Sequence, residues 1–158
     1  MGPIASIVDE IVKSGLATRR EITGCTEVEI GDLERYFGLR LPEEYKVFLK
    51  AMGKGAGSFM RGTDFYYQSL FANRDAIKEV LDLDGNPFAL SRTQFIFSSH
   101  QGYIFHLFDS DGRESDPPVF GYREQDLKMK QLSDTFTGFL TSLVDEHRGQ
   151  VYPRRYHQ

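Results

Sequence analysis

Residues 38–49 read Gly-Leu-Arg-Leu-Pro-Glu-Glu-Tyr-Lys-Val-Phe-Leu, and this stretch predicts a tight corner between two helices. Gly38 suits the left-handed residue that ends the first helix, because glycine has no Cβ to clash there. Pro42 is preorganised for the first turn of the second helix, and Glu43 and Glu44 complement the positive end of its dipole. The second helix carries a stripe at the spacing of a buried face, formed by Tyr45, Phe48, Leu49 and Met52.

Helices are also predicted before this corner. Residues 4–14 place apolar side chains at i, i+3, i+4 and i+7, and Ser14-Gly15 ends the pattern. Thr26 and Glu29 have the spacing of a capping box, which begins the helix that Gly38 ends. The first third of the chain is therefore predicted to be helical.

The periodicity changes after the glycines at 53, 55 and 57. The short aromatic segments Phe59-Met60 and Phe65-Tyr66-Tyr67 predict two strands, or a strand and a turn. Asn73 is then expected to cap a short helix that ends at Gly85-Asn86-Pro87.

The second half of the chain predicts a sheet and a closing helix. Strands are expected at residues 93–98 and 103–109, and the near-continuous apolar character of the second indicates a central strand. An Asp-Ser-Asp-Gly turn and a Pro-Pro pair precede a further strand at 119–122. Ser133 is expected to cap the last helix and Gly149 to end it. The class is thus α+β, with N-terminal helices, a central and mainly antiparallel sheet, and a C-terminal helix packed on it.

Length and composition predict one domain. The 158 residues, 40% of them hydrophobic, are enough for one core, assigned to residues 1–150 with 151–158 as a C-terminal tail. The sequence contains neither a run of about 20 apolar residues nor the pattern of a secretory signal, so we expect a cytoplasmic protein without a membrane partner. The single cysteine, Cys25, has no internal disulfide partner.

The net charge of the chain indicates which kind of partner it favours. The formal net charge is -4 and the isoelectric point about 5.6, which disfavours direct nucleic-acid binding and favours a basic partner. Two acidic turns, which contain residues 82–85 and 109–116, stand out in the sequence. They are interpreted either as solvated turns or as elements that attract a basic surface.

The motifs occur in a recognisable order. Glu34 is followed by Gly38-Leu39 and by Leu-Pro-x-x-Tyr-x-x-Phe-Leu at residues 41–49. Further on come Phe-Ser-Ser-His-Gln-Gly-Tyr at 97–103, Asp-Pro-Pro-Val at 116–119 and Phe-x-x-Phe-Leu at 136–140. Over residues 26–144 this order resembles the SUKH superfamily, which includes bacterial immunity proteins and a fungal regulator of cell-wall synthesis.

The resemblance implies a protein without enzymatic activity. It would bind and neutralise a cognate polymorphic or contact-dependent toxin, whose surface we expect to be basic or nuclease-like. The alternative that the superfamily suggests is an intracellular regulatory or scaffolding adaptor without a toxin partner. The match identifies neither the toxin, the binding face nor the oligomeric state.

The sequence contains no complete motif for catalysis, metal binding or cofactor binding. The segment 53–58 lacks the order of a phosphate-binding loop, and residues 109–116 lack that of a calcium loop. The four histidines show no metal-ligand spacing, and Cys25 lies in no recognisable nucleophile motif. No catalytic residue, metal or cofactor is therefore predicted. An enzyme that uses Cys25, His100 and a carboxylate is the third hypothesis.

Partner binding is assigned to acidic and tyrosine side chains. Carboxylates steer association, and tyrosines are frequent at the desolvated centre of interfaces. The competing interpretation is that these tyrosines pack in the core. The candidate residues are Tyr66, Tyr67, Asp82, Asp84, Tyr103, Asp109, Asp111, Glu114 and Asp116.

Overall fold

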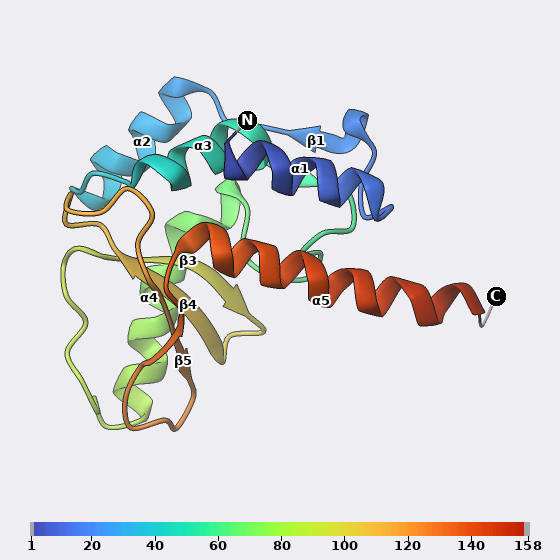
Figure 1. Ribbon diagram of the computed structural model, residues 1–158. Coiled ribbons are helices and arrows are strands. Elements are labelled where there is room, and N and C mark those ends of the chain that lie inside the picture. Colours follow the sequence, from blue (N-terminus) through green and yellow to red (C-terminus); the bar gives the residue numbers. More distant parts are fainter. Residues whose placement is uncertain (1, 157–158) are drawn as a thin grey trace.

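The computed structural model describes residues 2–156 of the chain, with side chains up to Arg148 (Figure 1). Its elements, in order, are α1 (Pro3–Lys13), the 3-10 helix η1 (Arg19–Glu21), β1 (Ile22–Thr23), α2 (Glu27–Phe37), α3 (Glu43–Met52), β2 (Gly55–Ala56), α4 (Tyr67–Leu83), β3 (Gln94–His100), β4 (Ile104–Asp109), β5 (Val119–Arg123), β6 (Lys130–Ser133) and α5 (Phe136–Tyr156). Within the described part of the chain, no helix has the length and apolarity needed to cross a membrane.

The predicted helical corner is confirmed. Thr26 Oγ1 accepts the Glu29 backbone N–H at 3.1 Å, and Glu29 Oε1 accepts the Thr26 N–H at 2.9 Å. Gly38 ends α2 with φ of 64°, in the left-handed region that glycine favours. Pro42 is the N-cap of α3 rather than part of its first turn. Glu34 Oε2 accepts the Leu41 N–H at 2.8 Å, so this carboxylate joins the end of α2 to the start of α3.

The sheet is antiparallel throughout, in the order β3-β4-β5-β6. β4 is an internal strand, as its apolar sequence predicted. The strand β6 and the small β1-β2 sheet were not predicted, because they are two to four residues long and carry no alternating apolar pattern.

Helices cover both faces of the four-stranded sheet. α4 packs Ile77 and Leu81 against one face, where they meet residues such as Phe105. The opposite face receives α3 and α5 through an aromatic nucleus of fully buried rings. Figure 1 shows α4 and α5 on opposite sides of the strands, with α1 to α3 grouped beyond one end of the sheet. The α+β class and the closing helix are therefore confirmed.

The predicted strands at 59–60 and 65–67 are wrong. Residues 57–62 form turns, and α4 begins at Tyr67. Asn73 is consequently not a cap but a buried residue within α4, whose Nδ2 donates to the carbonyls of Asp64 at 3.1 Å and Ile96 at 3.4 Å. Tertiary acceptors satisfy this amide, so its usual preference for a helix terminus is overridden.

Both predicted ends of the last helix are also wrong. Thr135 rather than Ser133 caps α5, since Thr135 Oγ1 accepts the Gly138 N–H at 3.0 Å while Ser133 ends β6. At its other end α5 continues through Gly149 to Tyr156. The predicted tail at 151–158 thus overlaps α5, and its residues 157–158 lie outside the described residues.

The buried hydroxyl of Tyr45 is expected to lower the stability of the fold. Its oxygen is buried without a hydrogen-bond partner among the described residues, while its ring packs 5.0 Å from that of Phe108. Tyr45→Phe should therefore stabilise the fold by about 1 kcal/mol, because a desolvated hydroxyl is removed and the ring remains. Urea unfolding measures the change. Tyr122→Phe is the matched control: its hydroxyl donates to Asp84, so this variant should destabilise the fold. A lower stability of Tyr45→Phe would contradict the prediction.

Candidate functional site

The two predicted acidic turns lie at opposite ends of β5. Asp116 precedes the start of that strand. Asp84 lies at the other end, where its Oδ2 accepts the hydroxyl of Tyr122 and the N–H of Gln125, the latter at 2.7 Å. The turns therefore do not form one continuous acidic patch.

Two of the four carboxylates of the β4–β5 turn, Asp111 and Asp116, accept internal hydrogen bonds. Asp116 accepts both the N–H of Thr137, at 3.0 Å, and its hydroxyl, at 2.5 Å, and so holds the start of α5. One carboxylate oxygen of Asp109 is buried without a partner among the described residues. Asp111 accepts the backbone N–H two residues further on. Asp111 and Glu114 are the exposed acidic residues of this turn.

The three candidate tyrosines have different environments. The Tyr66 hydroxyl donates to the Phe59 carbonyl at 2.6 Å, and burial raises the pKa of Tyr66. Tyr103 lies in the β3–β4 turn with its ring edge-on to His100. Tyr67 begins α4 and is only partly buried. Tyr66 is thus a structural residue, whereas Tyr67 lies at the surface.

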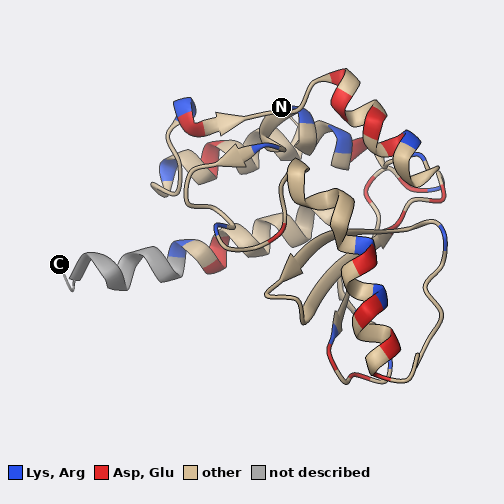
Figure 2. Cartoon of the chain, turned by 180° about the vertical axis from the view of Figure 1, so that it is seen from behind, with Lys and Arg blue, Asp and Glu red and all other residues tan. Residues whose placement is uncertain are grey.

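Tyr67 and Asp82, predicted separately, lie on one side of α4. Positions 67, 71, 74, 78 and 82 are spaced by three or four residues, which places them along a single face of a helix. This face extends over about 22 Å, since 15 residues each rise by 1.5 Å. We call these five residues and their neighbours from α2 and the 84–93 segment the α4 surface. Figure 2 shows Lys and Arg alternating with Asp and Glu along α4.

One end of the α4 surface is a partly exposed aromatic cluster. Its members are Tyr36, Phe37, Tyr67 and Phe71. The ring centroid of Tyr36 lies 4.8 Å from that of Phe37 and 5.1 Å from that of Phe71, yet the residue is 62% exposed. Tyr36 was not among the residues predicted to bind a partner. Its position next to Phe37 at the end of α2 marked it as aromatic, but only the docking of α4 beside α2 shows that it caps a cluster.

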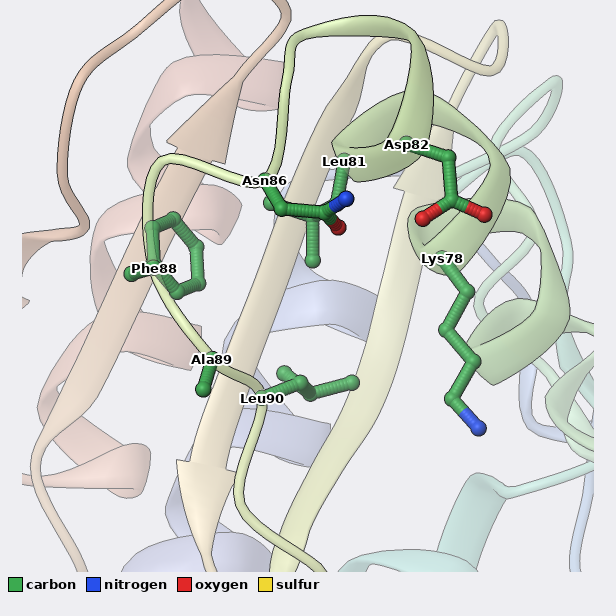
Figure 3. A pocket seen from close by; sticks show the side chains of 7 residues that line it. All are labelled: Lys78, Leu81, Asp82, Asn86, Phe88, Ala89 and Leu90. Atoms are coloured by element: carbon green, nitrogen blue, oxygen red, sulfur yellow. The ribbon is translucent and has the colours of Figure 1, made fainter.

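The other end of the α4 surface is a groove of about 450 Å³ between α4 and the 84–93 segment (Figure 3). Leu81, Phe88 and Leu90 contribute apolar walls. Lys78 and Asp82 stand at its rim, and they form no ion pair within the described residues. Both charges are therefore free to meet groups on a partner.

Arg74 connects the two ends of the surface. Its guanidinium donates to the Gln94 carbonyl at 2.8 Å and to the Ser91 carbonyl at 3.1 Å. These bonds hold the end of the 84–93 segment against α4 and so keep one wall of the groove in place. The α4 surface combines partly exposed aromatic rings, an apolar groove and separated charges, and aromatic residues are enriched at protein–protein interfaces.

Cys25 and His100, the groups considered for catalysis, have different environments. Burial, and secondarily Glu29, raises the pKa of Cys25 to about 11, which keeps the thiol protonated at neutral pH. His100 Nδ1 lies 3.1 Å from the Thr63 hydroxyl. Among the described residues, no three His, Cys, Asp or Glu side chains are placed to hold a metal ion.

Because His106 is buried, we expect the stability of the fold to depend on pH. Burial, and secondarily His100, lowers the pKa of His106 from its ordinary value of 6.5 to about 4. Between these values the unfolded chain binds a proton that the folded chain does not, so stability falls as the pH falls from 6.5 to 4. The loss reaches about 3 kcal/mol at its largest. Urea unfolding across this window should show the slope in the parent chain and in His147→Gln, but not in His106→Gln. A slope that persists in His106→Gln would assign it to another group.

Comparison with known protein families identifies a match. The sequence profile of the family SUKH_6, described as SMI1-KNR4 cell-wall, matches residues 27–140. This range begins with α2 and includes the whole α4 surface. No curated protein matches the chain.

Proposed function

Since this chain belongs to the SUKH_6 family, described as SMI1-KNR4 cell-wall, we propose that it is an immunity protein that neutralises a cognate bacterial toxin by binding it. Binding would be non-catalytic and take place in the cytoplasm. The family match supports a role within the SUKH superfamily, and the α4 surface supports contact with another protein.

The observation that carries this proposal is the position of Tyr36. Exposed tyrosines that rest on other aromatic rings lose little conformational entropy on binding and are frequent among the residues that dominate interface energies. Tyr36 is 62% exposed and is supported by Phe37 and Phe71, so its ring is already oriented before a partner arrives.

The groove end of the α4 surface adds specificity. A toxin side chain that enters the groove would contact Leu81 and Phe88, and a neighbouring basic group would pair with Asp82. Asp82 belongs to the acidic turn for which a basic or nuclease-like partner was predicted. In this proposal the protein covers or distorts the toxin's active site and performs no reaction.

A non-enzymatic role is further supported by Cys25. A nucleophilic cysteine requires a lowered pKa, because the thiolate is the reactive form. The pKa of Cys25 is instead raised to about 11, and the charged groups near it are Glu29 and Lys54 rather than a histidine.

Co-expression tests the proposal. The chain is produced together with the toxin domain encoded next to its gene, and survival and co-purification are measured. We expect full survival and a complex with one copy of each protein. Continued killing together with the absence of a complex would reject the proposal.

The cell-wall description of the family also favours a second candidate function. A cell-wall description is consistent with a regulatory or scaffolding adaptor that uses the same surface for a partner other than a toxin. A gene neighbourhood without a toxin gene, together with co-purification of a host protein that is lost in Tyr36→Ala, would support the adaptor.

A further inference from the structure

A second hollow lies on the face of the four-stranded sheet opposite α4. The strand register places His106 beside Gly121 and Gly121 beside Lys130, so a row of three residues crosses β4, β5 and β6. The hollow has a volume of about 280 Å³, and we call it the strand groove. Its lining on this face consists of Ile104, His106, Gly121, Arg123, Lys130 and Leu132.

Gly121 forms the floor of the strand groove. A Cβ at this position would lie 2.7 Å from Leu132 Cδ1 and 3.7 Å from His106 Cδ2. Any larger residue would therefore displace Leu132 and fill the hollow. The strand groove exists because the central residue of the row has no side chain.

The strand groove carries an excess of positive charge. Arg123 and Lys130 are exposed, and neither forms an ion pair with any described residue. One carboxylate, Asp126, also lines the groove, but its Oδ2 accepts the backbone N–H of Arg123 at 3.3 Å. The two unpaired cations therefore favour a ligand with a carboxylate.

The strand groove opens onto a free sheet edge. β6 is the last strand in the order, and in the described part of the chain no strand pairs with its outer side. Leu132, on this edge, is 49% exposed. An extended peptide that pairs with an edge strand gains main-chain hydrogen bonds, while its alternate side chains fill pockets on one face of the sheet.

We propose that an extended segment of a partner polypeptide pairs with the outer edge of β6 and places an acidic side chain between Arg123 and Lys130. A residue two positions away on the same segment packs its apolar side chain against Leu132, because alternate residues of a strand share a face. This site goes beyond the proposed function, since it lies on the other face of the sheet from α4.

A second copy of this chain is a poorer occupant of the same edge. Residues 127–133 of a second copy contain Lys128 and Lys130 but no carboxylate, so this segment cannot supply an acidic side chain to Arg123 and Lys130. The charge of the strand groove therefore distinguishes an acidic partner segment from self-association.

A peptide titration tests the site. The probe is acetyl-Val-Thr-Val-Thr-Glu-Thr-amide, added to the isotope-labelled full chain and followed by amide chemical shifts. We expect shifts concentrated at Lys130–Ser133 and Gly121. Replacing Glu by Gln in the peptide should weaken binding roughly tenfold, as should Lys130→Gln in the protein, because each removes a charged partner of one hydrogen-bonded pair.

Matched variants separate this site from the α4 surface. Lys128→Gln removes a neighbouring exposed charge that does not line the strand groove, and it should leave the affinity for the peptide unchanged. Tyr36→Ala should also have no effect, so a failure of the proposed toxin binding would not affect this result. Equal binding of the Glu and Gln peptides, absence of shifts at β6 with millimolar peptide, or dimerisation of the free chain through β6 would overturn the proposal.

Discussion

Tyr36→Ala is expected to weaken binding of the cognate partner by 30-fold or more, which corresponds to about 2 kcal/mol or more. The substitution removes the exposed ring that rests on Phe37 and Phe71, and it leaves a shallow, solvated surface at the end of α2. Isothermal titration calorimetry with the purified toxin domain measures the change. Most of the loss should appear in the dissociation rate, because short-range contacts form after encounter.

Two variants control this experiment. Tyr36→Phe keeps the ring and should retain most of the affinity. Val47→Ala removes an exposed apolar side chain, 44% exposed on α3, that does not belong to the α4 surface, and it should bind like the parent chain. Because Tyr36 is mostly exposed, the unfolding free energy of Tyr36→Ala should change by less than about 1 kcal/mol. Unchanged affinity in Tyr36→Ala would remove the aromatic cluster from the interface.

Phe97→Ala is expected to destabilise the fold by about 3–5 kcal/mol. The Phe97 side chain is fully buried in the aromatic nucleus. Its ring centroid lies 5.2 Å from that of Phe108, 5.3 Å from that of Phe136 and 5.8 Å from that of Phe139. Truncation leaves a cavity between β3, β4 and α5, where the surrounding rings cannot close it. Urea unfolding monitored by circular dichroism measures the loss.

Phe97→Leu is the matched control for the cavity. It keeps most of the apolar volume and should cost less than half as much as Phe97→Ala. Since total stabilities of domains are typically about 5–15 kcal/mol, Phe97→Ala is also expected to lower the yield of folded protein. Equal losses in the two variants would show that the aromatic edge contacts, rather than the filled volume, stabilise this region.

Local sequence was sufficient to predict the three helices of the N-terminal third, α1, α2 and α3. At the two ends of α2 lie the capping box of Thr26 and Glu29 and the glycine at position 38. Each depends only on groups within one helical turn of that end. The same holds for the strands β3, β4 and β5, whose apolar content and flanking turns were visible in the sequence. In these elements the spacing of neighbouring residues determines the backbone conformation.

The region around α4 was predicted poorly for the opposite reason. Phe65, Tyr66 and Tyr67 have a high strand propensity, yet Phe65 is fully buried in the core and Tyr66 is bonded to the Phe59 carbonyl. Asn73 finds its acceptors on residues nine and 23 positions away. Contacts this distant in sequence carry no local signal, so propensity pointed to a strand and a cap where a continuous helix forms.

The candidate site was also predicted only in part, because it depends on where α4 begins and on contacts between residues distant in sequence. Once α4 begins at Tyr67, its spacing brings Tyr67 and Asp82 onto one face, which the predicted shorter helix did not allow. Asp84 and Asp116, predicted to bind a partner, accept hydrogen bonds from other parts of the chain. Nothing in the acidic turns themselves distinguishes a structural carboxylate from a free one.

By itself, the sequence determined the helical corner, the α+β class and the superfamily resemblance, because caps, glycines and apolar periods act over three or four neighbouring residues. The tertiary structure alone decided which acidic and aromatic side chains reach the surface together. Tyr36 of α2 meets Phe71 of α4 only because both helices pack on a common core. Whether a polar group is free or hydrogen-bonded depends on residues that are distant in sequence and that folding brings close. The local sequence pattern does not indicate which residues these are.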